Sequence, residues 1–110
     1  MESKQSIEAT CPECRGPLSV IQENGRREYQ CLVGHASSAR NLLQAHSEVQ
    51  ERALWSAVVA LEEAGTMVEA IAPELEPSYV KRLHAQAEQK ERQALEIRKL
   101  LEQLEPFQSE

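Results

Sequence analysis

The chain has few of the residues from which a large globular core is built. Aromatic side chains make up only 4% of its 110 residues, namely Tyr29, Trp55, Tyr79 and Phe107. Its four glycines include no Gly-x-Ser-x-Gly segment, the pattern that exposes a nucleophilic serine on a sharp turn. No apolar run approaches the roughly 20 residues of a membrane-spanning helix. We therefore expect one small module, with neither a large core nor a serine nucleophile.

An excess of basic residues is also lacking. The formal net charge is −6 at pH 7, which disfavours strong nucleic-acid binding, because that binding depends on neutralising phosphates with Lys and Arg. The charge is unevenly placed: residues 48–76 hold seven Glu and one Arg, whereas residues 78–105 hold six Lys and Arg and five Glu. We expect the two stretches to attract each other, or the first to attract a basic partner.

Cysteine is scarce and its number is odd, since Cys11, Cys14 and Cys31 are the only three. An odd number fits poorly with a disulfide framework. Thiols that bind a metal must stay reduced, as they do in the cytosol. The first residues lead into no apolar run of the kind found in signal peptides. These features predict a soluble cytoplasmic protein.

The three cysteines and one histidine form the strongest chemical pattern in the sequence. Cys11-Pro-Glu-Cys14 is a Cys-x-x-Cys pair, and Cys31-Leu-Val-Gly-His35 places a histidine four residues after the last cysteine. Three thiolates and one imidazole complete the tetrahedron that zinc prefers in structural sites. A filled tetrahedron leaves no position for water or substrate. The pattern thus predicts one structural Zn²⁺ bound by Cys11, Cys14, Cys31 and His35.

Other interpretations of this motif are weaker. A rubredoxin-like iron site needs four thiolates. A redox-active Cys11–Cys14 pair normally lies in a βαβ context, which this sequence lacks. Two buried cysteines, a spare one and a surface histidine would not require the agreement seen here between ligand spacing and turn residues. His46 and His84 have no cysteine or carboxylate at ligand spacing, so we expect surface or interface residues there.

Residues 11–36 have the pattern of a zinc ribbon. Two strand-like segments flank Asn24-Gly25, a dipeptide favoured in two-residue hairpin turns because both positions need positive φ. Gly16 and Gly34 supply the unusual backbone dihedrals beside the two ligand pairs. The region has too few apolar residues to fold by burial alone, so we expect its folding to depend on the metal. Polar residues 1–10 are expected to form a disordered tail.

Two helical patterns follow the ribbon. The first region, residues 37–76, begins at a Ser37 or Ser38 cap and can place Leu42 and Leu43 against the ribbon. Ser47 offers a second cap, at which the helix either bends or continues. Its apolar series has alternating steps of four and three: Leu54, Val58, Leu61, Gly65, Val68, Ala72 and Leu75.

The second helix is expected over residues 78–105, after a turn marked by Pro77 with Ser78 as its cap. Its series is Val80, Leu83, Ala87, Lys90, Ala94, Ile97, Leu101 and Leu104, and Pro106 begins a tail over residues 106–110. A short connection makes two long helices antiparallel neighbours. The predicted fold class is therefore small α+β: a zinc-ribbon β-hairpin followed by a long, coiled-coil-like antiparallel helical hairpin. Gly65 either permits close helix approach or is a weak point costing about 1 kcal/mol.

Several segments together point to a known family. The chain contains, in order, Cys11-Pro-Glu-Cys14, Tyr29-Gln-Cys31-Leu-Val-Gly-His35-Ala-Ser-Ser, Asn41-Leu-Leu and Ala53-Leu-Trp55-Ser-Ala-Val-Val-Ala-Leu-Glu-Glu63. They resemble the C-terminal extension of certain bacterial chemotaxis receptor methylesterases of the CheB type, in which a zinc-ribbon-like segment runs into a helix bearing Ala-Leu-Trp. The resemblance covers about residues 11–70. It implies the same four zinc ligands and an association with chemoreceptor or two-component signalling.

The resemblance does not extend to the catalytic domain of those proteins. The glycine-rich nucleophile loop and the Ser-His-Asp triad have no counterpart in this sequence, so esterase activity is not implied. We therefore expect a non-enzymatic zinc module with an interaction or regulatory role in chemosensory or two-component signalling. Its helical hairpin would bind a protein partner or a second copy of itself, without membrane contact.

Two other function classes fit the sequence less well. A nucleic-acid-associated zinc ribbon is the alternative, because the ribbon carries Arg15, Arg26, Arg27 and Tyr29. Glu13, Glu23 and Glu28 in the same region nearly cancel that basic charge, which weakens the alternative. An enzyme would need an open metal position or a nucleophile–base pair, and the sequence shows neither.

Overall fold

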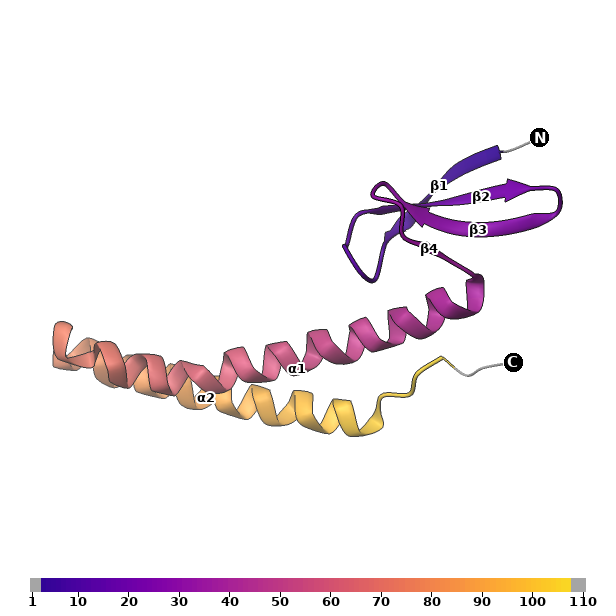
Figure 1. The fold of residues 1–110 in the computed structure, drawn as a ribbon. Coiled ribbons are helices and arrows are strands. Elements are labelled where there is room, and N and C mark those ends of the chain that lie inside the picture. The colour runs from indigo at the N-terminus through magenta and orange to yellow at the C-terminus, as the bar shows by residue number, and fades with distance from the viewer. Residues whose placement is uncertain (1–2, 108–110) are drawn as a thin grey trace. The chain divides into compact units, whose positions relative to one another are not determined.

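The computed structural model describes residues 3–107. Its elements, in chain order, are β1 (Ser3–Thr10), β2 (Pro17–Glu23), β3 (Arg26–Cys31), β4 (Ala36–Ser37), α1 (Ala39–Ile71), a short 3₁₀ turn (Ala72–Glu74) and α2 (Pro77–Gln103) (Figure 1). The predicted class, small α+β, is confirmed at this level: a four-stranded antiparallel sheet precedes one long helix and a second helix. No helix within residues 3–107 has the length and apolar character needed to cross a membrane.

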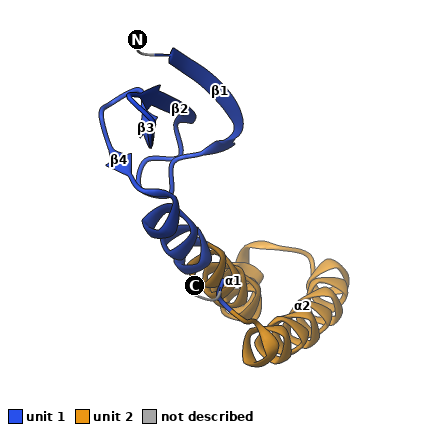
Figure 2. Ribbon diagram, turned by 90° about the vertical axis from the view of Figure 1, so that its right-hand side faces the viewer, with its two compact units in different colours: residues 1–49, 106–110 blue, residues 50–105 orange. Residues whose placement is uncertain are grey.

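The chain divides into two compact units, coloured separately in Figure 2. The described part of unit 1 covers residues 3–49 and 106–107, which include the sheet and the beginning of α1. Unit 2 covers residues 50–105, which include the rest of α1 and all of α2.

The sheet of unit 1 contains the predicted hairpin. Its strand order is β1-β2-β3-β4, and all three pairings are antiparallel. Glu23 at the end of β2 pairs with Arg26 at the start of β3, so the turn between them has two residues. Those residues are Asn24 and Gly25, with φ of 51° and 78°. Both positive values match the mirror-image turn that this dipeptide favours.

The first strand corrects the prediction of a disordered tail. Residues 3–10 form β1, which runs antiparallel to β2 from Ser3 opposite Gln22 to Thr10 opposite Pro17. Its polar composition concealed it, because an edge strand takes backbone hydrogen bonds from its neighbour while its side chains stay largely exposed. Ile7 is the member that packs onto the core. The first two positions of the predicted tail lie outside the described residues.

The core of unit 1 is small, and two of the three buried residues at its centre are cysteines. Cys11, Leu18 and Cys31 are 3%, 2% and 7% exposed, and Ile7 and Leu42 pack against them. Leu42 thus contacts the sheet as predicted, whereas Leu43 is exposed. Because two of the three central residues are candidate metal ligands, this core offers little apolar burial without an ion at its centre.

Hydrogen bonds show the roles of Ser38 and Ser47, two of the predicted helix caps. The Oγ of Ser38 accepts a hydrogen bond from the backbone N–H of Asn41 at 3.3 Å, so Ser38 is the cap at the start of α1. Helix α1 continues through Ser47, whose Oγ accepts the backbone N–H of Phe107 at 3.0 Å. This bond joins the predicted tail to the helix at Phe107; residues 108–110 lie outside the described part.

Unit 2 is an antiparallel pair of helices packed along the predicted apolar series (Figures 1 and 2). Val58 is fully buried, Ala87 and Ala94 are buried, and the other predicted positions are half-buried except Lys90, which is exposed. The position of a Cβ atom on Gly65 would lie 3.5 Å from the Oε1 of Glu91, an ordinary contact. Gly65 is therefore not required for close approach of the helices.

The connection between the helices differs from the prediction in one detail. Helix α2 begins at Pro77, and Ser78 lies inside the helix instead of capping it. Proline suits the first helical position because its φ is already helical and it has no N–H to leave without a partner. The helix ends at Gln103, two residues earlier than predicted, and the N–H of Leu104 donates to the carbonyl of Leu101.

Candidate metal centre

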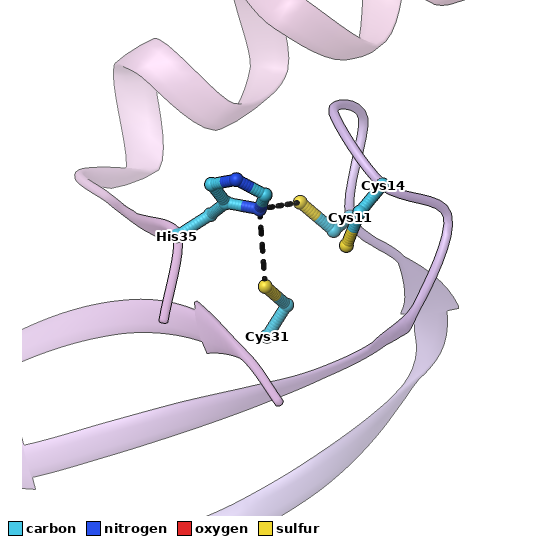
Figure 3. A group of neighbouring side chains, drawn as sticks. All are labelled: Cys11, Cys14, Cys31 and His35. Carbon is cyan, nitrogen blue, oxygen red and sulfur yellow. Dashed lines mark hydrogen bonds between the residues drawn. The ribbon is translucent and has the colours of Figure 1, made fainter. Parts of the chain in front are cut away.

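The structure brings the four predicted ligands together at one end of the sheet. Cys11 and Cys14 lie on the turn between β1 and β2, Cys31 ends β3, and His35 directly precedes β4. One ligand atom from each residue, three Sγ and one imidazole nitrogen, lies within 4.8 Å of all the others. Figure 3 shows the three sulfurs and the imidazole ring facing a common point. The cluster can bind one metal ion.

The imidazole faces the sulfurs through a particular nitrogen. The Nδ1 atom of His35 lies 3.3 Å from the Sγ of Cys31 and 3.7 Å from the Sγ of Cys11 (Figure 3). Typical zinc–ligand bond lengths imply edges of about 3.6 Å between nitrogen and sulfur in a tetrahedral site, and about 3.8 Å between two sulfurs. The two observed distances lie on either side of the expected edge. Small shifts of the side chains would therefore allow one tetrahedral ion to contact all four.

The first ligand pair is held by a tight turn. The N–H of Arg15 donates to the carbonyl of Cys11 at 2.8 Å, and the N–H of Cys11 donates to the carbonyl of Gly16 at 2.7 Å. The N–H of Gly16 also donates to the Sγ of Cys14 at 3.4 Å. The residue with positive φ is Arg15, at 65°, and not Gly16 as the sequence suggested. The closed ring of hydrogen bonds holds Arg15 in this conformation.

The second ligand pair lies on a similar turn. The N–H of Gly34 donates to the carbonyl of Cys31 at 3.2 Å, and the N–H of Cys31 donates to the carbonyl of His35 at 3.1 Å. Here the positive φ, 98°, falls on Gly34 as predicted. The turn returns the chain beside Cys31 within four residues, which brings the imidazole over its sulfur.

The thiols of the cluster differ in their affinity for protons. Burial raises the pKa of the Cys31 thiol, but hydrogen bonds from the backbone N–H groups of His35 and Val33 outweigh it, and contacts with the Cys14 and His35 side chains lower it further, to about 6. For Cys14 the N–H of Gly16 lowers the pKa, yet desolvation and the neighbouring Cys31 and Cys11 sulfurs raise it above its usual 9.0. Several thiolates in so small a volume repel one another, so the group favours a bound cation.

One neighbour of the cluster was missed at the level of sequence. The Oε2 atom of Glu13 lies 3.1 Å from the Nε2 atom of His35, on the side of the ring away from the sulfurs. From the sequence alone, Glu13 is only a charge that offsets nearby arginines. Its position inside the Cys-x-x-Cys turn was the available signal, because any side chain there projects from the same turn that presents the two thiols.

The other histidines stand outside the cluster. His46 is half-buried on α1 and His84 is exposed on α2, and neither belongs to the group of ligand atoms found in residues 3–107.

Comparison with known proteins adds no relative: no protein-family model, no curated protein and no solved structure matches this chain. The resemblance to CheB-type extensions therefore stays a hypothesis from the sequence.

Proposed function

We propose that this chain is a non-enzymatic module whose zinc ribbon is held by one structural Zn²⁺ on Cys11, Cys14, Cys31 and His35. The observation that carries the proposal is the convergence of three sulfurs and one imidazole nitrogen, all within 4.8 Å, from two separate turns. Four protein ligands fill a tetrahedral zinc site and leave no position for substrate. An ion in such a site stabilises structure instead of activating water.

The chemistry of the donors favours zinc among common metals. Thiolate sulfurs are soft ligands, which disfavours Mg²⁺, Ca²⁺ and Mn²⁺, and an iron–sulfur or rubredoxin-like site would use four thiolates. Three thiolates with one imidazole is a usual ligand set for structural zinc. The ion would replace the apolar burial that the small core of Cys11, Leu18 and Cys31 lacks.

The helical hairpin of unit 2 is the part that we propose for interaction with a protein partner or a second copy. Beyond the buried series, both helices carry large apolar side chains that are exposed: Val59, Met67, Leu95 and Leu100. The acidic first helix adds a charged surface that suits a basic partner. The resemblance of residues 11–70 to CheB-type extensions is the support for a role in chemosensory or two-component signalling.

Metal analysis of the purified chain tests the zinc site. We expect one Zn²⁺ per chain by elemental mass spectrometry. Cys14→Ser and His35→Ala should each weaken zinc binding by more than about tenfold, because each removes one of four direct ligands and loss of an outer partner alone typically costs about 10–100-fold. His84→Ala is the matched control, because it removes an exposed histidine outside the cluster. A chain that binds no zinc, or that keeps its affinity in Cys14→Ser, would contradict the proposal.

The interaction role needs a separate measurement. Purified cytoplasmic domains of chemoreceptors and histidine kinases encoded in the same genome as this chain are tested by biolayer interferometry, and self-association is tested by analytical ultracentrifugation. Met67→Glu combined with Leu95→Glu places charges on exposed positions of the hairpin and should abolish binding without changing zinc content. If the unaltered chain binds none of these domains and stays monomeric, the interaction proposal fails.

A further inference from the structure

We infer that Glu13 is a positioning residue for the metal centre. Its carboxylate holds the His35 ring so that Nδ1, and not Nε2, is the metal ligand. The inference rests on the proposed zinc site and adds a fifth residue to it. Glu13 does not belong to the ligand set, because its carboxylate contacts the nitrogen that faces away from the sulfurs. It acts on the ion only through the imidazole ring.

The two ring nitrogens of His35 have different surroundings. Nδ1 lies 3.3 Å and 3.7 Å from the sulfurs of Cys31 and Cys11, and Nε2 lies 3.1 Å from the Oε2 of Glu13. A neutral imidazole carries its single proton on one nitrogen, and the other nitrogen offers the lone pair that binds a metal. An ionised carboxylate only accepts hydrogen bonds, so the nitrogen that faces Glu13 is the one that carries the proton. Nδ1 is then free to bind the ion.

This arrangement follows from the turn that carries the first two thiols. Cys11 and Cys14 must both face the ion, which fixes the backbone of the two residues between them. Pro12 is buried, whereas Glu13 is exposed and extends towards the imidazole. A four-residue turn therefore contributes two ligands and the acceptor that orients a third. A carboxylate that accepts the second N–H of a metal-binding histidine fixes its tautomer and increases its basicity.

The exposure of the pair sets the size of the effect. The side chains of Glu13 and His35 are 66% and 41% exposed. When Glu13 is removed, water can therefore accept the hydrogen bond from Nε2 in its place. Loss of such an outer partner typically weakens metal binding by about 10–100-fold, and we expect the lower end of that range, roughly tenfold, for this exposed pair. An ordinary surface ion pair would change neither zinc affinity nor the protonation pattern of the ring.

The test compares zinc affinity and ring protonation in matched variants of the full chain. Affinity is measured by competition with a chromophoric zinc chelator, and ring protonation by long-range ¹H–¹⁵N correlation spectra of the zinc-loaded protein. Glu13→Ala should bind zinc roughly tenfold more weakly and should exchange its Nε2 proton with water faster. Glu13→Gln keeps an acceptor oxygen and should recover most of the affinity. Glu8→Ala, which removes an exposed carboxylate elsewhere in unit 1, should match the unaltered chain.

Two results would overturn the inference. One is a spectrum of the unaltered chain in which Nε2 binds zinc and Nδ1 carries the proton. The other is a Glu13→Ala variant with unchanged affinity and unchanged Nε2 proton exchange. Either outcome is distinct from failure of the zinc site itself, in which the unaltered chain binds no zinc at all.

Discussion

Arg98 on α2 forms a salt bridge with Glu62 on α1, 36 residues earlier in the sequence. Its Nη2 lies 2.9 Å and 3.1 Å from the two carboxylate oxygens, and its Nε lies 3.3 Å from one of them. The same guanidinium stands 5.4 Å from the centre of the Trp55 ring. Three residues are thus joined on one side of the helix pair. The contact links α1 and α2 beside the apolar series along which the two helices pack in unit 2.

Removal of this arginine should loosen the helix pair. Arg98→Ala loses both the ion pair, worth up to about 1 kcal/mol at an exposed site, and the cation–π contact, worth about 0.5–1 kcal/mol. We expect a loss of about 1 kcal/mol in the free energy of unfolding, measured by urea denaturation followed at 222 nm. The loss should shrink in high salt, which screens exposed charges. Arg92→Ala, an exposed arginine on the same helix, is the control; an equal loss there would reject a specific role for Arg98.

Removal of the metal should affect the two units differently. Unit 1 has a core built around Cys11, Leu18 and Cys31, whereas unit 2 has an apolar series along both helices that needs no ion. We expect a strong chelator to abolish the dispersed amide signals of β1, β2 and β3 in nuclear magnetic resonance spectra and to leave most of the helical circular dichroism. Added zinc should restore the strand signals. Strand signals that persist in metal-free protein would show that the ribbon folds without an ion.

Replacement of Gly65 should stabilise unit 2. The residue lies within α1, has no positive φ, and its Cβ position is in ordinary contact with Glu91 at 3.5 Å. Alanine is favoured over glycine inside helices by about 0.5–1 kcal/mol. Gly65→Ala should therefore raise the free energy of unfolding by about that amount. A decrease instead would mean that the helices can approach each other closely only when position 65 has no side chain.

Zinc binding should weaken as the pH falls, because protons compete with the ion for the thiolates. The pKa of Cys31 in the metal-free protein is lowered to about 6, so above that pH this sulfur is already a thiolate. The pKa of Cys14 is raised above 9.0, so its proton must leave on binding throughout the neutral range. The plot of log affinity against pH should therefore steepen below about pH 6, where the proton on Cys31 also competes with the ion. An affinity that does not change with pH would contradict binding through thiolates.

The sequence alone was informative where the structure depends on neighbouring residues. Asn24-Gly25 predicted a two-residue turn because few other dipeptides adopt positive φ at both positions. The alternating three- and four-residue spacing predicted the buried side of each helix, with Lys90 as the exposed exception. The spacing of the three cysteines and His35 likewise predicted a cluster, because ligands close in sequence on two turns need only one long-range pairing to meet.

The features that sequence could not supply depend on pairing between distant segments. Strand β1 exists because β2 accepts it at a sheet edge, which its own polar residues do not reveal. Arg15 adopts positive φ because the turn around it is closed by hydrogen bonds, although glycine stands beside it. Pro77 begins α2 and makes the expected Ser78 cap unnecessary.

The sequence by itself determined the ligand types, the hairpin turn and the apolar faces, because each follows from local spacing and backbone preference. Only the tertiary structure decided which nitrogen of His35 faces the sulfurs, that Glu13 contacts the other one, and that Arg98 meets Glu62. The physical reason is the same in each case. These contacts depend on the direction of a side chain across a gap between segments, and spacing along the chain specifies which residues come near but not which atoms meet.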